Sequence, residues 1–167
     1  MANKTKIALG GGCHWCTEAV FQALKGVINV EQGFAASEGD YTAFSEAVIV
    51  HFNTDVITLK TLIKIHLLTH KSASNHSMRT KYRSGIYAFS DDQHIEAETI
   101  LNAFQLEFEN KLITKVYSFS KFRPSREAIQ NYYLKNPKKP FCEAFINPKL
   151  KLLMDRFSRQ VNTEYIQ

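Results

Sequence analysis

The stretch KIALGGGCHWCTEAVFQAL, residues 6–24, predicts a strand, a tight turn and a helix in direct succession. Residues 6–9 form a short strand, and the three glycines after it allow the backbone to turn sharply and leave space around the next residue. Cys16, Val20 and Leu24 then recur at helical spacing as an apolar stripe. The turn therefore puts Cys13 at the beginning of a helix.

The neighbouring segments predict an α+β fold. The segment FSEAVIVHF, residues 44–52, is rich in β-branched residues and apolar on both faces, which is typical of a central strand. Further strands are expected at 27–34 and 84–89, and a helix at 58–70. The first six elements thus run strand, helix, strand, strand, helix, strand. This is the order of the ferredoxin-like split βαβ arrangement, with helices on one face of a mixed sheet.

The second half of the chain contributes the remaining elements. Ser90 and Gln93 form a capping box that opens a long helix, whose buried stripe would be Ala97, Leu101, Phe104 and Phe108. The other expected elements are a polar loop at 71–81, a helix end near 112, a strand at 116–120, a short helix at 126–134 and a basic helix at 148–159. We expect one domain over residues 1–167, with a core at about 4–120 and a C-terminal extension at about 121–167.

Composition places the chain among ordinary globular proteins. It has 167 residues, a formal net charge of +5 and three cysteines, too few for a disulfide framework. Residues 111–160 hold twelve Lys and Arg against three Asp and Glu, but no nucleic-acid motif organises them, so we interpret them as a solvated basic surface. Neither a signal peptide nor an apolar run of about 20 residues is present. We expect a cytoplasmic monomer that binds neither nucleic acid nor membranes.

The helix start favours a reactive thiol at Cys13. Free N–H groups and the helix dipole stabilise an anion there, and the thiolate is the nucleophilic form of cysteine. Cys16, one turn further along, is either a buried structural residue or a second thiol. His70, His76 and Cys142 could complete a zinc site with this pair, but no second paired spacing exists, so we expect no metal.

A C-x-x-C motif after a strand also occurs in thioredoxin-like proteins. Those proteins carry a cis-proline that faces the two thiols, some forty residues downstream. Here all four prolines lie beyond residue 120. The sequence therefore disfavours a thioredoxin-like fold.

Strand alternation puts Glu46 on one face with Phe44, Val48, Val50 and Phe52. A carboxylate among large apolar side chains loses hydration, which favours its protonated form. Such an acid is a candidate proton donor, although a glutamate near a strand end can also reach solvent. A thiolate, a nearby acid and a single tryptophan suggest attack on an electrophilic sulfur or carbon, with the acid protonating the leaving oxygen.

Five segments together resemble one known family. Residues 11–18, GGCHWCTE, resemble the G-G-C-F-W-C-x-E signature of A-type peptide methionine sulfoxide reductases. Ser45-Glu46-Ala47-Val48 resembles the end of that family's H-A-E-A-V strand, and residues 80–87, TKYRSGIY, resemble T-Q-Y-R-S-A-I-Y. Residues 133–142 resemble the Y-L-x-K-N-P-x-G-Y-C tail, and residues 146–157 a C-terminal helix of some members.

The resemblance implies a role for each matching residue. Cys13 would attack the sulfoxide sulfur, and Glu46 would give a proton to the sulfoxide oxygen. Tyr82 and, less directly aligned, Tyr41 would hydrogen-bond the same oxygen. Trp15 would line the pocket for the substrate methyl group.

The resemblance also implies how Cys13 returns to its reduced form after the reaction. Cys13 would be left as a sulfenic acid, and Cys142 would resolve it as a disulfide that thioredoxin reduces. No cofactor is implied. Cys142 follows Asn136-Pro137-Lys138-Lys139-Pro140, a segment expected to run over the surface, so we expect a mobile cysteine.

Several positions depart from the family pattern around the substrate pocket. His14 stands where the family has phenylalanine, and Ser77, beside His76, falls near the place of a family aspartate. Arg79-Thr80-Lys81 replaces Gly-Thr-Gln, Lys71-Ser72 replaces Asp-Pro, and residues 33–37 replace a Gly-Tyr-Thr-Gly-Gly loop. These changes motivate one alternative to the reductase, a sulfoxide-binding redox sensor without turnover. A second alternative is a general dithiol oxidoreductase using Cys13 and Cys16.

Overall fold

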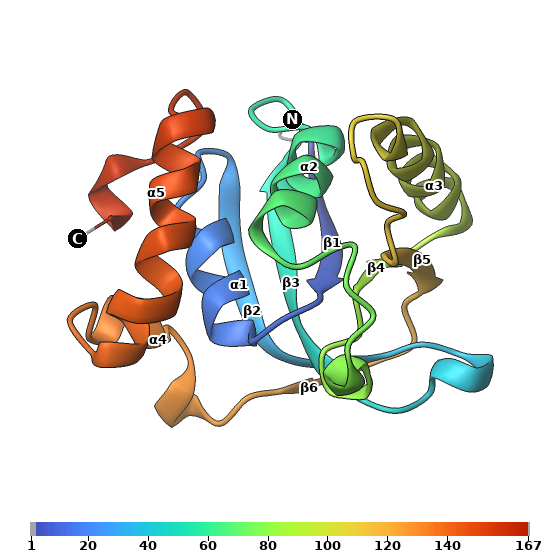
Figure 1. Cartoon of the computed structure of the whole chain (residues 1–167), viewed down its shortest axis with the longest axis horizontal. Helices are drawn as coiled ribbons and strands as arrows, with labels where there is room; N and C mark the ends of the chain where they lie inside the picture. Colours follow the sequence, from blue (N-terminus) through green and yellow to red (C-terminus); the bar gives the residue numbers. More distant parts are fainter. Residues whose placement is uncertain (1–2, 167) are drawn as a thin grey trace.

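The computed structural model describes residues 3–166 and is built on one six-stranded sheet (Figure 1). The strand order across the sheet is β5-β4-β1-β3-β2-β6. The strands are β1 Lys4–Gly10, β2 Val27–Ala36, β3 Ser45–Asn53, β4 Gly85–Ala88, β5 Lys115–Ser118 and β6 Lys121–Pro124. The inner strands β4, β1, β3 and β2 pair antiparallel, which confirms the ferredoxin-like core.

The sheet is mixed because β5 pairs parallel to β4, whereas β6 pairs antiparallel to β2. The predicted central strand is confirmed, since β3 lies between β1 and β2 and is buried from Ser45 to Val50. β6 was not predicted, and it continues the sheet into the segment that the sequence assigned to the C-terminal extension.

The helices gather on one face of the sheet, as expected (Figure 1). They are α1 His14–Gln22, α2 Leu59–Thr69, α3 Asp91–Gln105, α4 Tyr132–Lys135 and α5 Asn147–Arg156. The main core lies between these helices and the side chains of Ile7, Leu9, Val48, Val50 and Ile86. A smaller cluster on the opposite face is built around Ala8, Ala35, Ala47, Ile49 and Tyr87. No helix of the described residues is long and apolar enough to cross a membrane.

Two helix predictions were wrong in extent. The long helix ends at Gln105 rather than near Leu112, because the Gln105 side chain caps the next turn by bonding to Asn110 and Leu112. The helix expected at 126–134 is interrupted by Asn131, whose φ of 56° is left-handed. A short 3₁₀ turn, Glu127–Ile129, and the single-turn α4 take its place.

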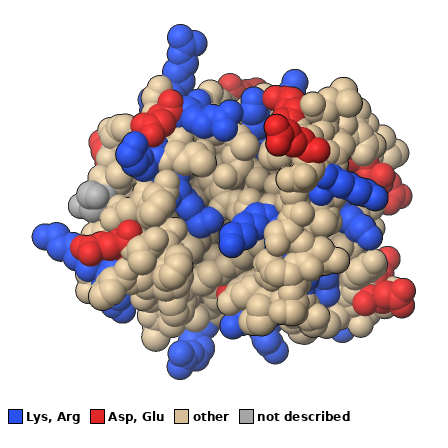
Figure 2. All heavy atoms as spheres, in the orientation of Figure 1, with Lys and Arg blue, Asp and Glu red and all other residues tan. Residues whose placement is uncertain are grey.

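Basic side chains are spread over the face shown in Figure 2 and do not form one continuous patch. Their scatter agrees with a solvated basic surface.

A buried histidine predicts how stability depends on pH. His66 on α2 is 2% exposed, and its Nε2 atom lies 2.8 Å from the carbonyl oxygen of Gly10. Burial lowers the pKa of His66 to about 4. The unfolded chain takes up a proton on this ring near its usual pKa of about 6.5, whereas the folded chain does not. The stability that depends on a neutral His66 is therefore fully present above the unfolded pKa of about 6.5, and it is lost as the pH falls toward the folded pKa of about 4.

We expect the free energy of unfolding to fall by roughly 1.5 kcal/mol between pH 6.5 and pH 5 on account of His66. Urea titrations at several pH values measure this slope. His66→Gln should be less stable at neutral pH but show a shallower slope. An equal slope in both proteins would contradict the assignment to His66.

Candidate active site

The turn after β1 sets the position of Cys13. Gly11 adopts a φ of +153°, and a Cβ atom there would lie 2.5 Å from the imidazole of His70. Glycine is therefore required for the close approach of the turn to α2. Cys13 is the N-cap of α1, and its carbonyl oxygen accepts bonds from the N–H groups of Cys16 and Thr17 at 3.1 and 3.2 Å. The predicted helix start is confirmed, with the Cys13 side chain partly exposed.

The pKa values of the two thiols of α1, Cys13 and Cys16, are shifted in opposite directions. A hydrogen bond from the Cys16 thiol is the main cause that lowers the pKa of Cys13, and the backbone N–H of Trp15 adds to it, against the effect of burial. The same hydrogen bond, with burial, raises the pKa of Cys16 far above its usual value. The shared proton therefore stays on Cys16, and Cys13 is the thiol of the pair that ionises first.

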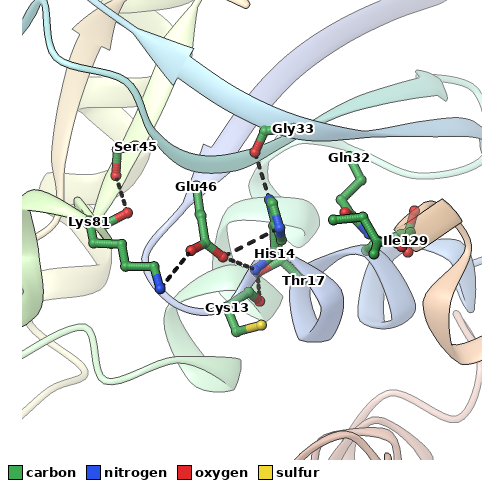
Figure 3. A network of polar contacts seen from close by, with 10 residues as sticks. Cys13, His14, Thr17, Gln32, Gly33, Ser45, Glu46, Lys81 and Ile129 are labelled. Atoms are coloured by element: carbon green, nitrogen blue, oxygen red, sulfur yellow. Dashed lines mark hydrogen bonds and ion pairs between the residues drawn. The ribbon is translucent and has the colours of Figure 1, made fainter. Parts of the chain in front are cut away.

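Glu46 lies directly beside this helix start (Figure 3). Its side chain comes from β3, is 6% exposed, and accepts a bond from the backbone N–H of His14 through Oε1 at 3.2 Å. The ammonium of Lys81 lies 3.6 Å from Oε2. The negative charge of Glu46 also acts on Cys13 and raises its pKa. The structure thus brings the thiol and the acid together, as expected from the sequence.

His14 is buried against Glu46 with a defined orientation (Figure 3). Its Nδ1 atom lies 2.7 Å from the carbonyl oxygen of Gly33, and its Nε2 atom lies 3.5 Å from Oε1 of Glu46. Because a carbonyl only accepts, the neutral ring carries its proton on Nδ1 and turns the Nε2 lone pair toward Glu46. Burial lowers the pKa of His14, while Gly33 and Glu46 oppose this.

The remaining predicted substrate residues lie at different distances from this centre. Tyr82 is half-buried, and the Lys81 ammonium lies 5.1 Å from the centroid of its ring. Tyr41 packs against Tyr117 with ring centroids 4.7 Å apart and ring planes tilted by 59°, and it lines a separate groove of about 550 Å³. Ser77 is exposed at the start of a 3₁₀ turn, Ser77–Thr80. The geometry thus supports Tyr82 as a substrate-binding residue more strongly than Tyr41 or Ser77.

Trp15 is covered by the C-terminal segment. Its ring stacks on Tyr132 with centroids 4.1 Å apart and an interplanar angle of 5°, and meets the edge of Phe141 at 5.1 Å. Glu18 ties this segment to α1, because its carboxylate accepts bonds from the N–H groups of Asn131 and Tyr132 at 2.9 and 3.1 Å. Any pocket that Trp15 lines is therefore shared with residues near α4.

Cys142 corrects one expectation. The segment before it is largely exposed, as expected, but the Cys142 side chain is fully buried in the main core, in the turn that precedes α5. Its Sγ atom lies 3.5 Å from the carbonyl oxygen of Asn136, and burial raises its pKa. Cys13, Cys16 and Cys142 are all free thiols. The mobility of Cys142 stays a prediction.

The site includes residues that the sequence did not single out. The described residues contain no cluster of three His, Cys, Asp or Glu side chains that could hold a metal ion. Instead, charged residues from distant segments approach the thiols and the acid: Lys81 beside Glu46, and Lys149 of α5 beside Cys13 and Cys16. The sequence indicated Lys81 only as a departure from a family pattern, and it gave no reason to select Lys149.

His14 allows a test of the pocket wall. His14→Phe should strengthen binding of the methyl-bearing end of a sulfoxide substrate, because a phenyl ring is less polar than imidazole. It should also lower the free energy of unfolding by about 1–3 kcal/mol, because the buried carbonyl of Gly33 loses its donor. Steady-state KM values and urea titrations measure the two effects. A higher KM in the variant would mean instead that His14 makes a polar contact with the substrate.

A thiol that ionises at a helix start, beside a buried carboxylic acid, defines a cysteine-dependent enzyme. A family model described as peptide methionine sulfoxide reductase matches residues 5–161. The chain belongs to this family and is an oxidoreductase.

Individual relatives agree with this assignment. Peptide methionine sulfoxide reductase MsrA from Trichodesmium erythraeum is 34% identical over 172 residues, which cover 93% of this chain and 97% of the relative. Mxr1 from Saccharomyces cerevisiae in its reduced form has a TM-score of 0.75 at 28% identity, covering 84% of this chain and 90% of that one. Mxr1 in complex with Trx2 has a TM-score of 0.63 at 27% identity, covering 78% and 85%.

Proposed function

We propose that this protein reduces the S epimer of methionine sulfoxide, free or in peptides, with Cys13 as nucleophile and Glu46 as proton donor. The observation that carries this proposal is the position of Cys13, which is the N-cap residue of α1, has its pKa lowered by the Cys16 thiol and lies near Glu46. Such a thiol is ionised more readily than a free cysteine and has an acid nearby, so it suits an electrophilic sulfur whose oxygen must leave.

The chemical step needs one proton and one thiolate. The Cys13 thiolate bonds to the sulfoxide sulfur while Glu46 transfers its proton to the sulfoxide oxygen, and the Tyr82 hydroxyl donates a hydrogen bond to that oxygen. The hydroxyl then passes to the sulfur of Cys13, as both the bond between oxygen and the methionine sulfur and the new bond between the two sulfurs break. Methionine leaves, Cys13 remains as a sulfenic acid, and Glu46 remains as a carboxylate.

Recycling uses a second thiol and an external reductant. The Cys142 thiol attacks the sulfur of the sulfenic acid, water leaves, and a Cys13–Cys142 disulfide forms. A thioredoxin dithiol then reduces this disulfide to two thiols. The complex of the related Mxr1 with Trx2 supports a thioredoxin as reductant, and a reducing cytoplasm suits this cycle.

An epimer-resolved assay tests the proposed function. The purified protein is supplied with methionine-S-sulfoxide or methionine-R-sulfoxide, thioredoxin, thioredoxin reductase and NADPH. We expect NADPH oxidation and methionine formation with the S epimer alone. Turnover of neither epimer, with binding of the S epimer retained, would favour a redox sensor.

The resolving cysteine provides a further prediction. After one turnover with stoichiometric sulfoxide and no reductant, we expect mass spectrometry of non-reduced peptides to find a Cys13–Cys142 disulfide with Cys16 free. Cys142→Ser should produce methionine once and then stop. The matched variant Cys16→Ser should still recycle, because it keeps both Cys13 and Cys142 and a hydroxyl donor next to Cys13.

The opposite pattern would favour the dithiol oxidoreductase. The main product would then be a Cys13–Cys16 disulfide, and Cys142→Ser would still recycle on thioredoxin. This result would mean that Cys16 of α1, and not Cys142, attacks the sulfenic acid. The two thiols shift each other's pKa values, which places them close together and keeps this alternative testable.

A further inference from the structure

A small cavity lies behind the two thiols of α1. It has a volume of about 40 Å³ and is closed by the glycine turn, the first turns of α1, the end of α2 and one residue of α5. Its polar lining consists of Cys13, Cys16, Thr17, His66, Thr69, His70 and Lys149. Residues from three helices therefore meet beside the two thiols, and Glu46 is not among the residues that line this cavity.

Lys149 brings a positive charge into this cavity. It is a half-buried residue near the start of α5, and its Nζ atom donates a hydrogen bond to the carbonyl oxygen of Thr69 at the end of α2. This bond holds a long, flexible side chain in one place. The orientation directs the ammonium toward the cavity that Cys13 and Cys16 line.

No carboxylate compensates this charge within the cavity. None of its described lining residues is Asp or Glu, and the two histidines carry no charge near neutral pH because burial lowers the pKa of His66 to about 4 and that of His70 well below its usual value. Lys71 is a further positive charge near Lys149. A thiolate on α1 is therefore the anion available to Lys149.

We propose that Lys149 is a positioning residue that holds the Cys13–Cys16 pair in its singly ionised form, with the negative charge on Cys13. The ammonium attracts the anion from behind, while the Cys16 thiol donates its hydrogen bond and the start of α1 adds its N–H groups. An ionised Glu46 has the opposite effect, because its negative charge raises the pKa of Cys13.

Electrostatic effects place the Lys149 ammonium near both thiols, and the larger of the two is with Cys16. Burial lowers the pKa of Lys149, and the nearby Cys16 and Cys13 oppose this effect. Lys149 in turn opposes the effects that raise the pKa of Cys16. In a cavity this closed, salt screens such an attraction less than at the surface.

The inference deepens the proposed function, and its consequence for catalysis rests on that function. Its test, however, does not use sulfoxide. The reduced protein is alkylated with iodoacetamide between about pH 5 and about pH 9.5, and mass spectrometry follows modification at Cys13. In Lys149→Gln, which keeps an N–H donor for Thr69 but loses the charge, the alkylation midpoint should rise by about one pH unit. Below the midpoint the rate should fall roughly threefold to tenfold.

Three further variants make the test specific. Lys149→Met removes both the charge and the hydrogen bond and should shift the midpoint at least as far, while Lys149→Arg should stay within about twofold of the wild-type rate. Lys151→Met removes an exposed lysine of the same helix, paired with Asp155 at 2.9 Å, and should change nothing. Circular dichroism confirms that each variant is folded.

An unchanged midpoint in folded Lys149→Gln would overturn the inference and leave Lys149 with a structural role through Thr69. A shifted midpoint in a protein that does not reduce methionine-S-sulfoxide would support the inference while contradicting the proposed function. If the enzyme is active, kcat/KM of Lys149→Gln should fall near neutral pH and recover at higher pH, which loss of packing would not produce.

Discussion

Cys13→Ser is expected to reduce sulfoxide reduction to the uncatalysed background. A serine hydroxyl does not ionise near neutral pH, so neither the helix start nor the Cys16 thiol can produce an anion there. Serine is also a favourable N-cap residue, and Cys13 occupies the N-cap of α1 without a side-chain cap of its own. The variant should therefore fold as well as the wild type, and the loss can be assigned to chemistry. Chromatographic detection of methionine measures it.

Cys16→Ser is the matched control for this prediction. It changes the other thiol of the same helix but keeps a hydroxyl that can donate a hydrogen bond to Cys13, so we expect most of the activity to remain. Near-normal turnover in Cys13→Ser, or a complete loss in Cys16→Ser with Cys13 still alkylated, would reverse the roles of the two thiols.

Local patterns were sufficient to predict the centre of the site. The glycine turn and the apolar stripe of α1 depend on residues close together in the sequence, and so does the alternation of β3. That alternation places Val48, Val50 and Phe52 in the main core on the side of the helices. Glu46 has the same parity, so its side chain reaches the start of α1, as the hydrogen bond to the N–H of His14 shows.

Contacts between distant segments could not be predicted in this way. Asn131 breaks the expected helix where its backbone and that of Tyr132 bond to Glu18, a partner more than a hundred residues away. Cys142 follows a polar, proline-containing segment that suggests exposure, yet the next helix carries it into the core. Lys149 resembles any surface lysine of an amphipathic helix until α5 is docked against α2. In each case a tertiary contact determined the outcome.

Glu46→Gln is expected to lower kcat/KM for methionine-S-sulfoxide by roughly 10²–10⁴-fold at neutral pH, the range that general acid catalysis supplies. The amide keeps the size of the side chain and an acceptor for the N–H of His14, but it has no proton to transfer. The loss should shrink as the pH falls, because acid from the solvent can partly replace the missing donor. Rates measured across pH with saturating thioredoxin test this.

A second buried glutamate provides the control. Glu18 is 1% exposed and bonds to Gln32 and to the backbone of the segment at Asn131, without contact to the sulfoxide oxygen in the proposed mechanism. Glu18→Gln should lower stability through those bonds and leave the pH dependence of the rate unchanged. The comparison separates the loss of a proton donor from the loss of a buried charge.

The alternatives to Glu46 as donor are also defined by the structure. The Lys81 ammonium lies 3.6 Å from Oε2 of Glu46, and Tyr82 lies beneath that ammonium. An unchanged rate in Glu46→Gln at neutral pH would therefore transfer the role to this pair, and Lys81→Met would then carry the large loss. If Glu46 is the donor, Lys81→Met should have a small effect, since an exposed ammonium adds little to a carboxylic acid that is already held by the N–H of His14. The ratio of the two losses thus identifies which group supplies the proton.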